Sequence, residues 1–318
     1  MKKIAILFGG PSKEREVSIK TAEQIFLSLQ DTEYYPIKIE LTKDLKLMND
    51  IYELSWQDLK SFDFVYIAIH GDYGEDGKVQ AILENYQIPY NGSNSKASNI
   101  GMDKLFTQNF LSQYGILSPK TILITNELLG SIDLTEFPIP CVIKPNQAGS
   151  SVGVEVIYNQ ENLIIALENV LKHNQQVLVQ EYVEGKEFTC GVIKNQGEEP
   201  LYTLPPVEII VEGDQFFDYN NKYNSTNTQE ICPPNISEEL SERIIQTSLK
   251  IHDLLYCDGL TRSDFIYDIK KDKLYFLEIN TIPGQTESSL CPLEAKVIGK
   301  TFQEFIIDQI ELGFKNNI

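Results

Sequence analysis

The stretch Arg262-Ser263-Asp264, followed along the chain by Glu278-Ile279-Asn280, decides the fold and the chemistry of this protein. Strand side chains alternate between two faces, so Arg262 and Asp264 share one face, and Glu278 and Asn280 share one face of the next strand. The polar run at 270–273 predicts a hairpin turn that places the two strands side by side. We therefore expect two carboxylates, one amide oxygen and one guanidinium to face a single point.

The residue types of this hairpin suit a site for nucleotide phosphates. Hard oxygen ligands that leave coordination positions open suit Mg²⁺ bound to phosphate oxygens, and a guanidinium suits a phosphoryl group in transfer. The alternative is a simple salt bridge on the solvent face of a hairpin. The apolar flanks at 265–267 and 275–277 favour a buried sheet, in which carboxylates need a partner such as a metal. The pattern indicates an ATP-using enzyme.

Length and composition describe an ordinary globular protein of several domains. The 318 residues predict two or three domains of roughly 100 residues each. The net charge of −19 argues against nucleic acid as a partner and requires a phosphate site to carry its own cations. Five scattered cysteines without a CxxC pair fit reduced thiols in a cytoplasmic protein. We expect no membrane span, and residues 1–8 indicate a buried first strand rather than a signal peptide.

The first third of the chain alternates strands and helices, which predicts an α/β unit with a parallel sheet. The strands are expected at 4–8 and 64–69, and the helices at 16–29 and 79–85. In such sheets the functional groups gather in loops at the carboxyl ends of the strands. The candidate loops are 9–14 and 70–77.

A second and a third unit follow. The second is expected to begin around 99–104 and to contain strands at 141–144, 154–157 and 177–182 and a helix at 161–173. The third runs from 183 to the end, with helices expected at 237–256 and 294–314. Its segment 208–232 has no clear periodicity, and such a long structureless run is typical of an active-site lid or of disorder. Four aromatic residues favour a packed lid: Phe216, Phe217, Tyr219 and Tyr223.

Two segments of the second unit suit nucleotide binding. Residues 144–154 leave a strand and return to one through a glycine-rich loop, whose amides and hydroxyls can cradle phosphates beside Lys144. This is not a Walker A loop, and the alternative is a plain hairpin. Residues 177–188 offer backbone groups to an adenine edge and a carboxylate to ribose hydroxyls. The alternative there is a strand with a charged end.

Taken together, these motifs resemble the ATP-grasp fold and, more narrowly, the D-alanine–D-alanine ligases, over essentially the whole chain. The motifs that carry the resemblance are GGxSxEREVS at 9–18, HGxxGEDG at 70–77, Met102-Asp103-Lys104, Lys144-Pro145, GSSVG at 149–153, DYxxKY at 218–223, Arg262-x-Asp264, ExNTxPG at 278–284, and Ser289-Leu290. The resemblance implies an N-terminal Rossmann-like domain at 1–98, a central α+β ATP-grasp subdomain at 99–182, and a C-terminal antiparallel-sheet subdomain at 183–318 with a lid at 208–232.

The resemblance also implies a reaction. ATP would phosphorylate the carboxylate of a first D-alanine, and the amine of a second D-alanine would attack the acyl phosphate. A tetrahedral intermediate would then expel phosphate, giving D-alanyl-D-alanine for peptidoglycan synthesis in the cytoplasm. The resemblance further suggests a homodimer formed through the first unit.

The implied catalytic residues bind the first substrate and stabilise the reacting groups. Glu14 would hold the ammonium of the first D-alanine, although it could merely be an exposed carboxylate at a helix start. Hydrogen bonds from Ser150 and Tyr223 to Glu14 would dock the lid and exclude water, because acyl phosphates hydrolyse. Lys222 and Arg262 would neutralise the phosphoryl group.

The second substrate and ATP would occupy the remaining positions. Arg262 and the amides around Gly284 would form an oxyanion hole, and His70, Ser289 and Leu290 would contact the second substrate; alternatively, His70 is a buried histidine that caps a strand. ATP would be bound by Lys104, Lys144, Ser151, Gln180, Glu181, Val183 and Glu187. Two Mg²⁺ ions, with Mn²⁺ as an alternative metal, would be held by Asp264, Glu278 and Asn280.

Three positions depart from the family pattern. Gln180 stands where an acidic adenine contact is expected, Gln285 stands where methionine is common, and Glu287 adds a carboxylate near the second-substrate pocket. Gln285 and Glu287 leave the identity of the second substrate open, although Lys222-Tyr223 favours an amine acceptor over a hydroxy acid. The alternatives are an ATP-grasp amide ligase using D-serine, an L-amino acid or a dipeptide, and a non-catalytic ATP-binding sensor.

Overall fold

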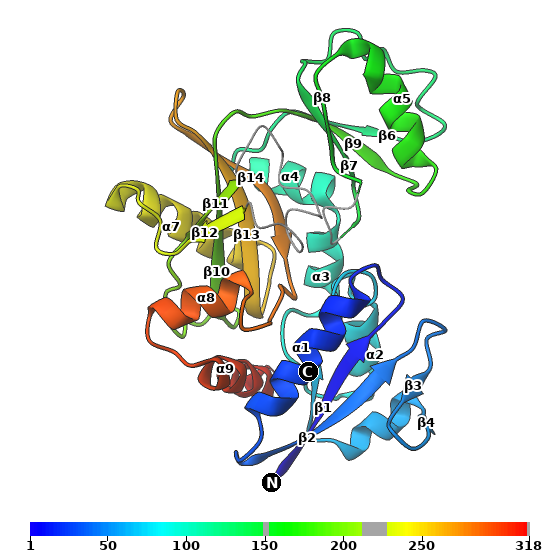
Figure 1. Ribbon diagram of the computed structural model, residues 1–318, viewed down its shortest axis with the longest axis vertical. Helices are drawn as coiled ribbons and strands as arrows, with labels where there is room; N and C mark the ends of the chain where they lie inside the picture. Colours follow the sequence, from blue (N-terminus) through cyan, green and yellow to red (C-terminus); the bar gives the residue numbers. More distant parts are fainter. Residues whose placement is uncertain (149–152, 212–227, 317–318) are drawn as a thin grey trace.

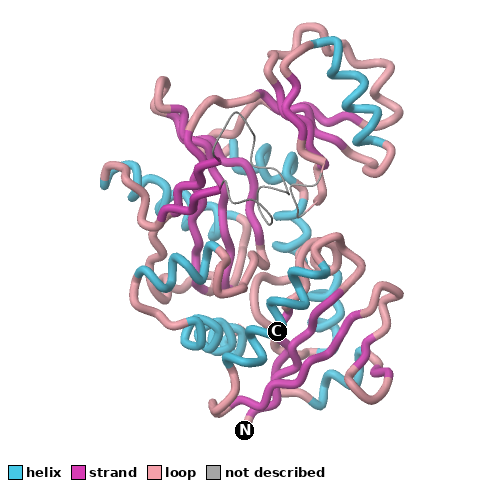
Figure 2. Tube along the Cα trace, in the orientation of Figure 1, coloured by secondary structure: helices cyan, strands magenta, loops and turns pink. Residues whose placement is uncertain are grey.

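The architecture rests on three sheets, each with helices packed on it, in a computed structural model that describes residues 1–148, 153–211 and 228–316. Figure 2 shows the strands gathered in three separate groups with helices around them. The predicted combination of an α/β unit with antiparallel sheets is confirmed. The domain boundaries at 98/99 and 182/183 stay predictions.

The N-terminal sheet has the strand order β4-β3-β2-β1-β5. Strand β1 (Lys2–Gly9) pairs in parallel with β2 (Tyr34–Leu41) and with β5 (Phe64–Ile67), whereas β3 (Leu47–Met48) and β4 (Glu53–Leu54) are antiparallel additions. Helix α1 (Arg15–Ser28) connects β1 to β2, the 3₁₀ helix η1 (Trp56–Ser61) connects β4 to β5, and helix α2 (Lys78–Tyr86) follows β5. Both candidate loops follow parallel strands, and Ser12 Oγ donates to the carbonyl of His70 at 2.7 Å. The two loops therefore meet, as predicted.

The central sheet is small and antiparallel. Its order is β6-β9-β7-β8, formed by β6 (Thr121–Ile124), β7 (Cys141–Pro145), β8 (Glu155–Ile157) and β9 (Val177–Glu181). Helix α5 (Gln160–Leu171) buries Leu163, Leu167 and Leu171 against it. Apolar residues of α5 recur at helical spacing, which is why the sequence predicted this helix.

The C-terminal sheet has the order β12-β11-β10-β13-β14. Its strands are β10 (Lys186–Lys194), β11 (Val207–Val211), β12 (Thr228–Ile231), β13 (Gly259–Asp268) and β14 (Lys273–Asn280). Helices α3 (Ser95–Met102), α4 (Lys104–Ser112) and α7 (Glu238–Leu254) contribute to one apolar core with Phe265 and Phe276 of this sheet. Because strand side chains alternate, Arg262 and Asp264 lie on the opposite face, toward the central sheet.

The C-terminal helices return to the N-terminal sheet. Helix α8 (Leu290–Val297) leads into α9 (Phe302–Lys315), which packs against α1 and β5. Figure 1 shows α9 beside α1, so the two ends of the chain lie in the same part of the molecule. Phe305, Ile306 and Ile310 of α9 share one core with Ile4 and Phe64.

Two predicted elements need correction. The single helix expected at 294–314 is two helices, because Gly299 has a φ of +88° and Thr301 begins α9 with a capping box to Glu304. The segment 208–232 is not structureless at its ends, since β11 and β12 pair antiparallel there; its middle lies outside the described residues. Strand β2 was not predicted.

All five cysteines are free thiols, as expected. Within the described ranges, no helix has the length and apolar character that crossing a membrane would require.

Buried His252 predicts an acid-sensitive core. Its Nδ1 lies 2.8 Å from Thr261 Oγ1, and burial lowers its pKa from 6.5 to about 4, with the nearby Asp253 and Lys194 acting in opposite directions. As the pH falls below 6.5, the unfolded chain binds a proton that the folded chain does not. The free energy of unfolding should therefore fall, by about 2 kcal/mol from this group at about pH 5.

Denaturant unfolding of the wild type and of His252→Gln at about pH 7 and about pH 5 measures this effect. The substitution also acts on stability in ways that do not depend on pH, so the relevant quantity is the difference in the free energy of unfolding between the two pH values. The variant should lose about 2 kcal/mol less than the wild type between them. An equal loss in both proteins would contradict the assignment.

Candidate active site

The predicted hairpin is confirmed, and its register brings the four side chains together. Arg262 pairs with Asn280, and Asp264 pairs with Glu278. The guanidinium of Arg262 donates from Nε and Nη2 to the two oxygens of Asp264, at 2.8 Å each, and Asn280 Nδ2 donates to Asp264 Oδ2 at 3.2 Å. Arg262 is buried. A fixed, bidentate guanidinium thus stands beside both carboxylates.

A β-bulge next to these residues changes which side chains of strand β14 point toward the cavity. Asp264 pairs with Glu278, but Phe265 pairs with Phe276, so Leu277 has no residue opposite it. A bulge shifts the alternation of faces by one residue. Leu277 and Glu278 consequently both line the same cavity, although they are neighbours in sequence.

The cavity lies between the central and C-terminal sheets and collects most of the residues predicted to bind ATP. The predicted residues that line it are Lys104, Lys144, Gln180, Glu181, Val183, Glu187, Arg262, Asp264, Glu278 and Leu290. They come from α4, β7, β9, β10, β13, β14 and α8, and from the connection after β9. Sequence-distant groups therefore meet in one pocket.

Two buried lysines give this acidic protein a local positive site. Lys104 Nζ lies 3.2 Å from Glu278 Oε2 and donates to the carbonyl of Ala148 at 2.7 Å. Burial lowers the pKa of Lys144 from 10.5 to about 8, and the nearby Glu278 opposes this shift. A lysine with this pKa is mostly protonated at neutral pH. Both positions suit binding of an anionic polyphosphate.

The residues present fit a divalent metal ion bound together with phosphates. Within the described parts of the chain, no cluster of three or more His, Cys, Asp or Glu could hold a metal alone. Asp264, Glu278 and Asn280 offer hard oxygens on adjacent register positions. Mg²⁺ favours such a partial set, because it takes its remaining ligands from substrate phosphates and water. The assignment of the three ligands stays a prediction.

Apolar side chains that the sequence analysis did not name form walls of the cavity. They are Pro119, Val142, Val154, Ile209, Ile266 and Leu277. Such walls suit the flat, largely apolar faces of a purine base. Period-two alternation could have found two of them, because Val142 shares a face with Lys144, and Ile266 shares a face with Asp264.

A second group of predicted residues lies where the two N-terminal loops meet. Glu14 is buried rather than exposed, and a Cβ on Gly71 would lie 2.6 Å from its Oε2, so a side chain at position 71 would displace the Glu14 carboxylate. His70 is also buried, with Nε2 at 3.0 Å from Thr21 Oγ1 and Nδ1 at 3.2 Å from the carbonyl of Ile282. His70 thus joins the N-terminal unit to the loop after β14. Direct contact of His70 with a substrate stays a prediction.

The loop after β14 places Gly284 against Ser289. A Cβ on Gly284 would lie 3.1 Å from Ser289 Oγ. Ser289 precedes the first turn of α8, and its Oγ accepts a hydrogen bond from the amide of Thr286 at 3.0 Å. The helix start and the glycine thus face each other, which suits recognition of a carboxylate or an oxyanion.

The two residues of this loop that depart from the family pattern, Gln285 and Glu287, both form hydrogen bonds to the N-terminal unit. Gln285 is buried, and its Oε1 accepts a hydrogen bond from the hydroxyl of Tyr66 on β5. Glu287 is exposed, and its amide donates to Gln24 Oε1 on α1 at 2.7 Å. Both residues therefore tie the loop to the N-terminal unit.

Four predicted site residues lie outside the described residues: Ser150, Ser151, Lys222 and Tyr223. Their roles in the glycine-rich loop and in the lid stay predictions. The described neighbours of the glycine-rich loop, Ala148 and Val154, line the cavity.

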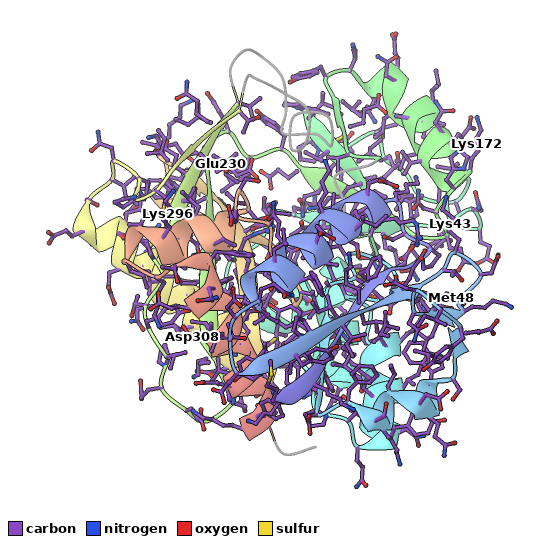
Figure 3. All side chains as sticks on the ribbon, turned by 60° about the horizontal axis from the view of Figure 1, so that its bottom comes forward. Lys43, Met48, Lys172, Glu230, Lys296 and Asp308 are labelled. Atoms are coloured by element: carbon purple, nitrogen blue, oxygen red, sulfur yellow. The ribbon has the colours of Figure 1, made fainter. Side chains whose placement is uncertain are left out.

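Glu294 of α8 is a buried carboxyl that the sequence analysis missed. Both of its oxygens accept from the amide of Gly191, at 2.9 and 3.2 Å, and burial raises its pKa well above the ordinary range. Gly191 lies opposite Arg262 in the β10–β13 pairing. Figure 3 labels Lys296, which is on the exposed side of the same helix. Glu294 thus anchors α8 beside the strand that carries Arg262.

Comparison with known proteins agrees with this geometry. The family models described as "D-ala D-ala ligase C-terminus" and "D-ala D-ala ligase N-terminus" match residues 112–311 and residues 3–56 and 49–93. The D-alanine–D-alanine ligase of Carboxydothermus hydrogenoformans is 37% identical over 98% of both chains.

Solved structures of relatives share the fold. The crystal structure of the VanG D-Ala:D-Ser ligase from Enterococcus faecalis superposes with a TM-score of 0.86 at 29% identity, covering 98% of this chain and 99% of that one. The Bacillus anthracis D-alanine–D-alanine ligase complexed with ATP gives a TM-score of 0.82 at 31% identity, covering 99% and 98%. The ATP-grasp architecture is thereby confirmed, and the chain belongs to the D-alanine–D-alanine ligase family.

Proposed function

We propose that this enzyme joins two D-alanines at the cost of one ATP through an acyl-phosphate intermediate, giving D-alanyl-D-alanine, ADP and phosphate. The observation that carries the proposal is the cavity in which Arg262, Asp264 and Glu278 face Lys104 and Lys144. We place the reaction in the cytoplasm, in the supply of peptidoglycan precursors. The similarity to D-alanine–D-alanine ligases over nearly the whole chain supports this assignment.

In the first step, a carboxylate oxygen of the first D-alanine attacks the γ-phosphorus of ATP, and the bond to the β-phosphate oxygen breaks. Glu14 holds the ammonium of this D-alanine, while Arg262 and Lys222 balance the charge of the phosphoryl group. Lys104 and Lys144 bind the phosphates. Mg²⁺ at Asp264, Glu278 and Asn280 supplies charge neutralisation and orientation when it is bound.

In the second step, the deprotonated amine of the second D-alanine attacks the acyl carbon. Arg262 and the amides around Gly284 stabilise the oxyanion of the tetrahedral intermediate, which then expels phosphate. Ser289 and Leu290 receive the carboxylate of the second substrate. We assign Ser150 and Tyr223 to docking of the lid on Glu14, which excludes water from the acyl phosphate.

Release of ADP and the mass of the product, measured with Mg²⁺-ATP and D-alanine, test this proposal. D-serine, D-lactate and L-alanine serve as competing acceptors, and the D-serine arm is needed because one similar structure is a D-Ala:D-Ser ligase. D-alanyl-D-alanine should be the main product. A main product with another acceptor would contradict the specificity, and ATP binding without any turnover would favour a non-catalytic sensor.

We also propose that the enzyme is a homodimer through its N-terminal unit, as the family resemblance suggests. Light scattering of the purified chain measures the molar mass directly. One chain has a mass of 36.2 kDa, and we expect a molar mass of twice this value. A mass of one chain at micromolar concentration would contradict this arrangement.

A further inference from the structure

Gln108 of α4 connects the two walls of the nucleotide cavity. Its Nε2 donates to the carbonyl of Leu277, the bulged residue of β14, at 2.8 Å. Its Oε1 accepts from Thr121 Oγ1 on β6 at 3.1 Å and from Gln180 Nε2 on β9 at 3.4 Å. Gln108 is 3% exposed, and Figure 1 shows α4 between β14 and the central sheet. Gln108 belongs to none of the sequence motifs described above.

The chemistry of these groups fixes which end of each amide faces which partner. A backbone carbonyl can only accept, so the Nε2 of Gln108 must lie at Leu277. The Oε1 of Gln108 then lies at the other end and can only accept, so Gln180 must present Nε2 to it. Thr121 Oγ1 accepts from the same Nε2 at 2.8 Å. The donor and acceptor of each hydrogen bond are therefore fixed along the chain of bonds from Leu277 through Gln108 to Gln180.

This arrangement of donors and acceptors leaves the Oε1 of Gln180 as the atom that faces the cavity. Gln180 lines the cavity, and its Oε1 has no hydrogen-bond partner in the described parts of the chain. A glutamine alone could present either a donor or an acceptor to a base. Here the hydrogen bonds of Gln180 Nε2 to Gln108 and Thr121 fix the orientation of the amide, so that Gln180 presents an acceptor.

We propose that Gln108 is a specificity-determining residue that makes the site select adenine over guanine, by holding Gln180 with its acceptor toward the base. The 6-amino group of adenine donates a hydrogen bond, whereas O6 of guanine only accepts one and would face the Oε1 of Gln180 without a proton between them. An unpaired polar group at this buried position costs affinity. The inference deepens the proposed function, because it rests on the use of ATP.

Nucleotide binding without any amino acid tests the inference separately from ligation. The affinities of the wild type, Gln108→Met and the control Gln309→Met for Mg²⁺-ATP and Mg²⁺-GTP are measured by calorimetry. Methionine keeps the volume of glutamine but has no amide, so the amide of Gln180 becomes free to turn over. The control replaces another buried glutamine, whose side chain bonds, among the residues that the structure describes, only to the carbonyl of Phe305 within α9.

The ratio of ATP affinity to GTP affinity is the decisive quantity. We expect it to fall by about tenfold in Gln108→Met and to stay unchanged in Gln309→Met. A merely structural defect would weaken both nucleotides equally and leave the ratio at the wild-type value, which would overturn the inference. Equal affinities for ATP and GTP in the wild type would overturn it as well.

A second pair of variants covers the case in which Gln108→Met does not fold. Thr121→Val removes the hydroxyl that holds the Nε2 of Gln180 and should also lower the ratio, while Thr121→Ser should restore it. An unchanged ratio in Thr121→Val would overturn the inference while ATP-dependent ligation still stands. Absence of ATP binding by the wild type would contradict the proposed function itself, and the inference would fall with it.

Discussion

Replacing Arg262 by lysine is expected to lower kcat for D-alanyl-D-alanine formation by about 10²- to 10³-fold. The guanidinium is fixed by two hydrogen bonds to Asp264 and is buried at the cavity. Lysine keeps the positive charge but cannot reproduce the planar fork, so it bonds Asp264 at one point and leaves the phosphoryl group and the oxyanion less stabilised. Steady-state kinetics with saturating ATP and D-alanine measure the loss.

Arg243→Lys is the matched control for this experiment. Arg243 also pairs with an aspartate, Asp272, at 2.9 Å, but it lies on α7 and does not line the cavity. Its replacement should leave kcat within a factor of about two, because exposed ion pairs contribute little. A loss of less than tenfold in Arg262→Lys would contradict the role of Arg262 in both chemical steps.

Replacing Glu14 by glutamine is expected to lower kcat/KM for D-alanine by about 10²-fold or more. Glu14 is buried against Gly71, where the loops after β1 and β5 meet. A neutral amide in this place would leave the ammonium of the first D-alanine without its counter-charge, and a buried unpaired charge is costly. The affinity for ATP should change little, because Glu14 does not line the nucleotide cavity.

Glu16→Gln provides the control, since Glu16 lies two residues further along the chain and is exposed. It removes the same charge from the first turn of α1 and should leave kcat/KM unchanged. If Glu14→Gln raised the KM for ATP as strongly as that for D-alanine, the separation between the two halves of the site would be wrong.

The hairpin at 262–280 could be predicted because it depends on a local rule. Arg262 and Asp264, like Glu278 and Asn280, are two residues apart on strands joined by a polar turn, and alternation alone places them together. The bulge at Leu277 could not be predicted. The carbonyl of the bulged residue accepts a hydrogen bond from Gln108, which lies 169 residues away in the sequence, and no local pattern indicates such a contact.

The prediction of one helix at 294–314 is wrong, although the sequence itself contains residues that indicate a break between two helices. Gly299 adopts a left-handed conformation that favours glycine, and Thr301 with Glu304 is a capping-box pattern. Amphipathic periodicity on both sides of this break outweighed those residues. Periodicity reports which face is buried and does not by itself locate the end of a helix.

The partners of buried glutamines show where sequence patterns carry no information. Gln285 departs from the family pattern, but no pattern in the sequence indicates its contact with Tyr66, which lies 219 residues earlier in the chain. Gln108 gave no signal at all. Both depend on how the sheets pack against each other, which propensity and periodicity do not encode.

The central claim, ligation through an acyl phosphate, is tested most directly with D-alanine whose carboxylate carries ¹⁸O. The carboxylate oxygen that attacks ATP stays with phosphorus when the tetrahedral intermediate collapses. Mass spectrometry should therefore find one ¹⁸O in the phosphate released for each peptide bond formed, together with ADP. Unlabelled phosphate, or AMP and pyrophosphate in place of ADP and phosphate, would contradict the account.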